Sequence, residues 1–335
     1  MTSKEFAALL GVSQSTISRA LNGSSLVSAE TRDLIQKKAA EYGFVLNSQA
    51  RSLKTNRTGT IGILFPKHFV GMHANLGLAY LYDLVQEKLK NQGYDVMVVY
   101  DAVDANGASL FERTVKRHKA DGFIILTLAL DSRDLELIHE YNIPCVYLLN
   151  AVKPDAQSSS CISDSEYGGY LAGQYLGAFK DYLPCYLNTE ETADTRSRRN
   201  GYIRGLEEQG ISLPPSRILS CNLSIRSAFD CVIRNQQLLK ENKCSIFAYN
   251  DILALGAVNA CSHLGLNVPE QVQIVGMDGL PLIGELSPRI TTVNVFHKDI
   301  AEMGCDLLQK IIKNKTKKVI QMLVKPELVK GETSL

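Results

Sequence analysis

Two patterns of apolar residues divide the chain near residue 59. Within residues 3–22, apolar side chains recur at the spacing of an α-helix on either side of Gly11. From residue 60 onward, continuous apolar runs of strand length alternate with longer helical segments. The patterns predict a small all-α head followed by a larger α/β body.

The head is expected to fold as three short helices. Its first two helices carry the apolar residues Phe6, Leu9, Leu10, Val12, Ile17 and Leu21. Gly11 interrupts the pattern where a tight turn needs positive φ, and Ser13 stands where an N-cap would begin the second helix. A third helix, capped by Ser28, is predicted over residues 29–42. The side chains of this helix expected to face the core are Leu34, Ile35, Ala39 and Tyr42. Two helices joined by a glycine-containing turn are typical of DNA-binding helix-turn-helix proteins.

The outer face of the second helix is unusually polar. It carries Gln14, Ser15, Ser18, Arg19 and Asn22. Such side chains donate to and accept from base edges in the major groove of DNA. The alternative is a three-helix domain that binds protein, and the lack of large apolar groups on this face disfavours it.

The body is predicted to contain two runs of strands and helices. Strands are expected at 60–65, 95–100, 121–127, 144–149, 183–187, 217–221, 245–249 and 272–278. Helices are expected at 75–91, 107–118, 132–140, 165–179, 196–209, 225–240 and 251–264. Apolar strands that alternate with helices indicate parallel sheets covered on both faces, and two such runs indicate two lobes.

Charge is distributed unevenly along the chain. The net charge is +1, yet residues 1–57 hold eight Lys and Arg against four Asp and Glu. A local anionic partner, usually nucleic acid, explains this excess, and a solvated charged face is the alternative.

All eight cysteines lie at or beyond Cys145 without metal-binding spacing, which favours reduced thiols, no metal and no cofactor. Neither a secretory signal nor a membrane-spanning run is recognisable, so a cytoplasmic protein is expected.

The head resembles one known family. The segments GVSQSTISRALNG, VSAETRDLI and NSQARSLKT are similar, in order and spacing, to the head of the lac/gal repressor family of bacterial transcription regulators. The resemblance implies a DNA-binding domain at 1–46 and a hinge helix with linker at 47–59. In that family the hinge helix forms on operator DNA, and a leucine, here Leu53, enters the minor groove and kinks it. The residues implied to contact DNA are Thr2, Gln14, Ser15, Ser18, Arg19, Asn22, Ser28, Thr31, Asn47, Ala50, Arg51 and Leu53.

The likeness continues to about residue 330 and implies a two-lobed effector-binding and dimerisation domain at 60–335, similar to periplasmic sugar-binding proteins. The N-lobe is expected at about 60–162 and 291–320, and the C-lobe at about 163–290 and 321–335. Effectors are expected between the lobes, at the carboxyl ends of strands. The implied effector-binding residues are His68, Phe69, Asp164, Arg198, Asn250, Asp278 and His297.

The resemblance leaves the effector open. Arg198 suits a carboxylate, a phosphate or a sugar diol, so a sugar or sugar phosphate is expected. Asp251 is expected to cap a helix, and loop capping is the alternative for Asp164 and Asp278. Two positions depart from the family. Leu223 stands where some sugar-responsive members have an aromatic residue, and Gly279 replaces a second aspartate. A small effector, a ring stacked on Phe69 or Phe229, and a non-sugar effector therefore all stay possible.

Together these observations predict a sequence-specific transcription regulator, a repressor, rather than an enzyme. The sequence has no GxSxG, P-loop or HExxH motif. A solute-binding protein for transport fits the fold, but not the basic head or the missing signal. Because no leucine heptads follow Val329, a homodimer on a near-palindromic operator is expected.

Overall fold

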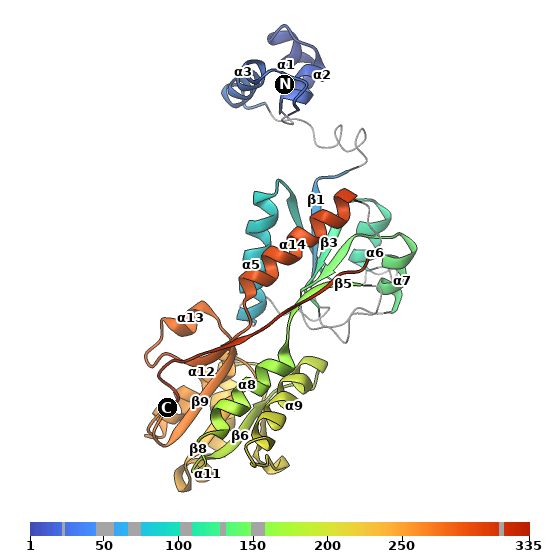
Figure 1. Ribbon diagram of the computed structural model, residues 1–335. Coiled ribbons are helices and arrows are strands. Elements are labelled where there is room, and N and C mark those ends of the chain that lie inside the picture. The colour runs from blue at the N-terminus through green and yellow to red at the C-terminus, as the bar shows by residue number, and fades with distance from the viewer. Residues whose placement is uncertain are drawn as a thin grey trace. The chain divides into compact units, whose positions relative to one another are not determined.

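The computed structural model describes residues 1–21, 24–44, 57–65, 75–100, 109–127, 132–148, 158–314 and 318–335 (Figure 1). Contacts divide it into one compact unit of residues 1–59 with 118–121 and another of residues 60–117 with 122–335. No helix within these described ranges is long and apolar enough to cross a membrane. The predicted site residues outside the described residues are Asn22, Asn47, Ala50, Arg51, Leu53, His68 and Phe69.

The head contains the three expected helices, α1 (Ser3–Leu9), α2 (Gln14–Leu21) and α3 (Ala29–Glu41). Gly11 has φ +66°, which its lack of a Cβ permits, so the chain turns sharply between α1 and α2. Ser13 Oγ accepts a hydrogen bond from Thr16 N at 3.1 Å and caps α2, as the sequence predicts.

The core of the head differs from the prediction on one side. Phe6, Ile17 and Ile35 are fully buried, as expected. Leu34 and Tyr42, however, are 55% and 48% exposed, so their predicted inward placement is wrong. The ring of Phe44, just beyond α3, stacks on Phe6 with a centroid distance of 4.2 Å and fills that part of the core instead.

The first lobe of the second unit is built on a parallel sheet in the order β11-β5-β4-β3-β1-β2. Its strands are β1 (Thr60–Phe65), β2 (Asp95–Tyr100), β3 (Gly122–Ile125), β4 (Cys145–Tyr147), β5 (Ser159–Ser163) and β11 (Gln321–Val324). Its helices are α5 (Leu76–Asn91), α6 (Leu110–Lys116), α7 (Ser132–Glu140) and α14 (His297–Asn314). Helices α5 and α14 pack against each other over one face of this sheet (Figure 1).

The second lobe has a sheet in the order β12-β10-β9-β8-β6-β7, parallel except for β12. Its strands are β6 (Leu183–Asn188), β7 (Ile218–Ser220), β8 (Cys244–Ala248), β9 (Val272–Asp278), β10 (Thr291–Asn294) and β12 (Glu327–Val329). Its helices are α8 (Ser165–Gly177), α9 (Ala193–Glu207), α10 (Ile225–Arg234), α11 (Gln236–Glu241), α12 (Asp251–His263) and α13 (Pro281–Gly284). The single helix expected at 225–240 is divided at Asn235 into α10 and α11.

The chain passes between the two sheets three times, after β5, after β10 and after β11 (Figure 1). Two expected boundaries need correction. Residues 291–294 form β10, which pairs with β9 of the second sheet, so the return to the first lobe comes after Asn294. Residues 321–324 form β11, which pairs with β5 of the first sheet. Each of the two strands thus pairs within its own sheet before the chain leaves that lobe.

Helices α8 and α9 pack with their backbones in unusually close contact. A Cβ at Gly169 would overlap the carbonyl oxygen of Arg198, and one at Gly201 would overlap that of Glu166. Only glycine permits this approach, because any side chain would force the two backbones apart. Since Arg198 lies on α9, this contact also determines where its side chain can reach.

We expect Gly201→Ala to destabilise the second unit by about 3 kcal/mol, because the added methyl overpacks a backbone contact that cannot relax. Urea unfolding of the full chain measures the change. The control is Gly284→Ala, where a Cβ meets nothing within 4 Å. We expect the control to change stability by less than about 0.5 kcal/mol. Equal stabilities of the two variants would contradict the close α8–α9 contact.

Candidate binding cavity and head-domain surface

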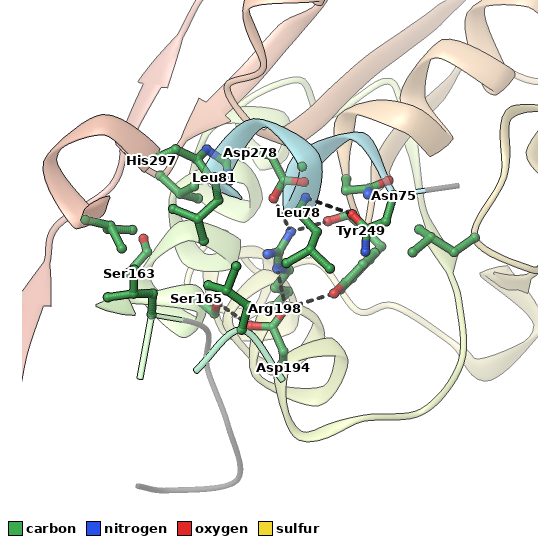
Figure 2. Close-up of a pocket in the computed structure, with 17 residues that line it drawn as sticks. Asn75, Leu78, Leu81, Ser163, Ser165, Asp194, Arg198, Tyr249, Asp278 and His297 are labelled. Carbon is green, nitrogen blue, oxygen red and sulfur yellow. Dashed lines mark hydrogen bonds and ion pairs between the residues drawn. The ribbon is translucent and has the colours of Figure 1, made fainter. Parts of the chain in front are cut away.

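A cavity of about 850 Å³, including space open to solvent, lies in the second unit and is lined from both lobes (Figure 2). Its described lining consists of Asn75, Gly77, Leu78, Leu81, Leu126, Leu148, Ser163, Ser165, Asp194, Arg198, Leu223, Tyr249, Asn250, Asp278, Val295, His297 and Ile300. Several of these residues follow strands directly, as expected of ligand sites at the carboxyl ends of parallel strands. Asp278, for example, is the last residue of β9.

Arg198, at the centre of the cavity wall, is 9% exposed. Its Nε lies 2.9 Å from Asp194 Oδ2, and its Nη1 donates to Asp278 Oδ1 at 2.9 Å. Nη1 also donates to the carbonyl oxygen of Tyr249 at 2.8 Å, and the guanidinium carbon lies 4.5 Å from the centre of that ring. Burial alone lowers the pKa of Arg198, but the two carboxylates outweigh it and raise the pKa well above its usual value. Arg198 is therefore a fixed, permanent cation.

Asp278 reaches Arg198 from a strained position. Its φ of +124° is rare for a residue with a side chain, and such strain persists only where surrounding contacts enforce it. Its Oδ2 lies 3.4 Å from where a Cβ at Gly77 would stand, in the first turn of α5. A carboxylate at the start of a helix is favourable, because the unpaired amides there carry partial positive charge.

Asp194 and Tyr249 complete the polar wall, and the sequence analysis missed both. Asp194 Oδ1 accepts from Ser165 Oγ at 2.5 Å, and its Oδ2 accepts from the Tyr249 hydroxyl at 2.9 Å (Figure 2). Asp194 precedes Arg198 by one helical turn, a spacing that brings two side chains together on one helix face. The four-residue spacing from Arg198 is the feature of the sequence that could have identified Asp194 as its partner.

The structure gives three residues at strand ends local hydrogen-bonding roles that bear on their predicted ones. Asn250, a predicted ligand contact, lines the cavity, but its Oδ1 accepts from Leu253 N at 3.0 Å and caps α12. Asp251 was expected to be that cap. Instead, Asp251 is fully buried, and its carboxylate accepts a hydrogen bond from Leu280 N at 2.8 Å. This bond stabilises the turn after β9. Asp164 caps α8 by accepting from Tyr167 N at 2.9 Å and does not line the described cavity, whereas its neighbours on both sides do.

The remaining walls are mainly aliphatic. Leu78 and Leu81 of α5 face the cavity from the first lobe (Figure 2). Leu223, in the loop before α10, also lines it. Phe229, a possible stacking residue in the sequence analysis, is not part of the described lining and packs against His263 with ring centroids 5.5 Å apart. The described residues therefore offer a ligand extensive aliphatic surface.

His297, at the start of α14, lines the cavity as expected and is 8% exposed. Burial lowers the pKa of its imidazole despite the nearby Asp278 carboxylate, so the ring is neutral at neutral pH. Within the described residues, its Nδ1 has no hydrogen-bond partner. This nitrogen is itself buried, so His297 contributes mainly its ring surface to the described cavity wall.

The head presents the predicted polar surface. Gln14, Ser15 and Arg19 of α2 are exposed, while Ile17 and Ala20 on the opposite side of the helix are buried. Among the other predicted DNA contacts, Ser18 is partly buried on α2. Residues Thr2, Ser28 and Thr31 lie at helix starts. Thr2 caps α1 in a reciprocal pair with Glu5, and Ser28 Oγ accepts from Thr31 N at 3.3 Å.

Sequence comparison gives two family matches. Residues 2–47 match the lacI family of bacterial regulatory proteins, and residues 182–334 match the periplasmic binding protein-like domain. The chain is 29% identical over 346 positions to the HTH-type transcriptional repressor PurR of Vibrio atlanticus, covering 99% of this chain and 98% of the relative. It is 27% identical over 334 positions to the PurR repressor of Pasteurella multocida, covering 98% of this chain and 97% of that relative.

Solved structures share the fold along the whole chain. The lac repressor dimer bound to operator and the anti-inducer ONPF superimposes with a TM-score of 0.77 at 24% identity, covering 99% of this chain and 98% of that one. A complex of the transcriptional regulator CelR with cellobiose gives a TM-score of 0.71 at 23% identity and covers 99% of both chains. The predicted fold class, a helix-turn-helix head followed by a two-lobed α/β body, is confirmed.

The lowered pKa of His297 predicts a pH dependence of stability. Below about pH 6.5 the unfolded chain binds a proton at this histidine that the folded chain does not, so the free energy of unfolding falls as pH falls. His297 contributes up to about 1.4 kcal/mol per pH unit to that slope. Urea unfolding between pH 5 and 7.5 should therefore give a shallower slope for His297→Gln than for His263→Gln, whose histidine is exposed on α12. Identical slopes would contradict a neutral, buried His297.

Proposed function

We propose that this chain, whose residues 2–47 match the lacI family of bacterial regulatory proteins, represses transcription by binding operator DNA under the control of a small ligand. One observation carries the proposal. A helix-turn-helix head with an exposed polar recognition face is joined, in one chain, to a two-lobed domain with a buried ionic network lining a cavity. A regulator needs both parts, whereas a transport protein needs only the second.

On the DNA side, helix α2 enters the major groove, and its exposed Gln14, Ser15 and Arg19 contact base edges. The basic excess of residues 1–57 attracts the phosphate backbone. The family resemblance implies a hinge helix at residues 47–53, which lie outside the described residues, and the proposal includes entry of Leu53 into the minor groove of a near-palindromic operator bound by a homodimer. The protein acts in the cytoplasm, where its DNA target is accessible.

On the ligand side, the cavity binds a sugar or sugar derivative. Carboxylate, guanidinium and imidazole groups converge on its polar wall, and they can hold several hydroxyl groups in fixed directions. The aliphatic walls cover the C–H faces of such a ligand.

Control of DNA binding follows from the three chain crossings between the lobes. A ligand that contacts both lobes changes the population of lobe arrangements only as far as its affinity for those arrangements differs. The lobe arrangement determines the separation of the two heads in the dimer, and with it the fit to two operator half-sites.

The proposal is tested by selecting genomic DNA fragments with the pure full-length protein, with and without a pool of sugars. We expect enrichment of one near-palindromic site, altered by the pool. Arg19→Ala is the control for base recognition, because this exposed side chain lies outside the head's core. It should lose enrichment and keep weak binding to random DNA. No enriched site under any condition would overturn the proposed function.

Arg198→Ala is expected to abolish the ligand response of operator binding while DNA binding itself survives. Removal of Arg198 takes the guanidinium away from two buried carboxylates, so the stability of the variant is measured alongside. Arg198→Lys keeps the charge but loses the planar fork, and should show the same loss of response. The matched control is Arg199→Ala, whose side chain pairs with Glu191 away from the cavity lining. If both Arg198 variants lost DNA binding, the role of Arg198 would be to stabilise the fold and not to bind the ligand.

A further inference from the structure

Among the lining residues that the structure describes, acidic side chains outnumber basic ones. Among the described lining residues, Arg198 is the cation, while Asp194 and Asp278 are carboxylates. His297 adds no charge at neutral pH, because burial lowers its pKa. The described wall therefore carries a net negative charge in a place largely shielded from water.

The guanidinium of Arg198 is also occupied. A carboxylate or phosphate binds arginine best through two neighbouring N–H groups, either Nε with Nη2 or Nη1 with Nη2. Nη1 donates to Asp278 Oδ1 at 2.9 Å and to the carbonyl oxygen of Tyr249 at 2.8 Å. Nε lies 2.9 Å from Asp194 Oδ2 in an ion pair that does not have hydrogen-bond geometry. Each of the two binding edges thus has one nitrogen in direct contact with a carboxylate of the protein itself. An anionic ligand would have to displace Asp194 or Asp278 to bind both nitrogens of either edge.

Asp194 cannot be displaced easily. It is 5% exposed and is held from three elements, since Ser165 of α8 donates to one carboxylate oxygen and the Tyr249 hydroxyl after β8 donates to the other. Arg198 lies one turn further along the same helix. The close packing of α8 on α9 holds this arrangement, because Gly169 contacts the backbone of Arg198 directly.

We propose that Asp194 is a specificity-determining residue that restricts the cavity to uncharged, polyhydroxylated ligands and excludes their phosphate esters and carboxylates. Hydroxyl groups can donate to Asp194 and Asp278 without displacing Arg198. An anion would add like charge to a desolvated, negatively charged wall, which is costly. This inference rests on the proposed function and narrows its ligand from a sugar or sugar derivative to an uncharged one.

Inorganic phosphate is the probe for the anion side of the proposal. Binding is measured at constant ionic strength by calorimetry and by the melting temperature of the full-length protein. Wild type should gain no stability from phosphate. Asp194→Asn, which removes one charge and keeps the shape, should bind phosphate about tenfold or more tightly than wild type. Replacing Arg198 by Lys in the Asp194→Asn background should remove this gain.

Two further variants make the phosphate result decisive. Glu191→Gln removes a carboxylate that pairs with Arg199 on the same helix but lies outside the cavity lining, and it should not respond to phosphate. Asp194→Ser replaces Asp194→Asn if the asparagine variant fails to fold. Phosphate binding to wild type that depends on Arg198 would overturn the proposal, and so would a folded Asp194 variant that gains no phosphate affinity.

The second arm compares a panel of uncharged aldoses with their phosphate esters and uronic acids on wild type. At least one uncharged sugar should bind, and more tightly than its ester. A panel in which no uncharged compound binds, or in which an ester binds best, overturns the proposal. Operator enrichment is measured on the same preparations. Loss of enrichment alone would overturn the proposed function and leave the charge selectivity of the cavity intact.

Discussion

A buried guanidinium held between two carboxylates is the interaction on which the second lobe's side of the cavity depends. Arg198 of α9 joins its own helix to the end of β9 through Asp194 and Asp278, each at 2.9 Å. Such a group tolerates no loss of a partner, because any charge left unpaired there lacks water to solvate it. Asp278 accordingly keeps an unfavourable φ of +124° to complete the network. The polar wall is therefore in place before a ligand arrives, and binding need not order it.

The same network ties ligand binding to the path of the chain between the lobes. The first crossing leads directly from β5 through Asp164 into α8, and the glycine contacts of α8 place α9 and hence Arg198. Each lobe closes its own hydrophobic core, around β1 in the first and around β8 in the second. A change in the angle between the lobes can therefore alter the cavity without disturbing either core, which is the usual basis of hinge motion in two-lobed proteins.

Local patterns were sufficient for the order of the elements and for the head. Apolar runs at 60–65 and 272–278 became β1 and β9 with the expected bounds, and Gly11 and Ser13 formed the turn and cap that their chemistry favours. The polar strand β5 and the elements after β9 were not among the predicted strands and helices. Short segments such as Thr291–Asn294 carry no clear periodicity, and their state depends on the neighbouring strand with which they pair.

The sequence by itself indicated the fold class and the resemblance to a family, because these depend on motifs and spacings within short stretches of chain, and that resemblance singled out Arg198. Only the tertiary structure decided which neighbours those residues meet. It made Asn250 rather than Asp251 the helix cap, because Asp251 binds a turn that lies 29 residues away in the chain. It also placed Asp194 against Arg198 and Tyr249 and left the wall negatively charged. Spacing along a helix allows such a contact, but burial and distant partners determine whether it forms and what it excludes.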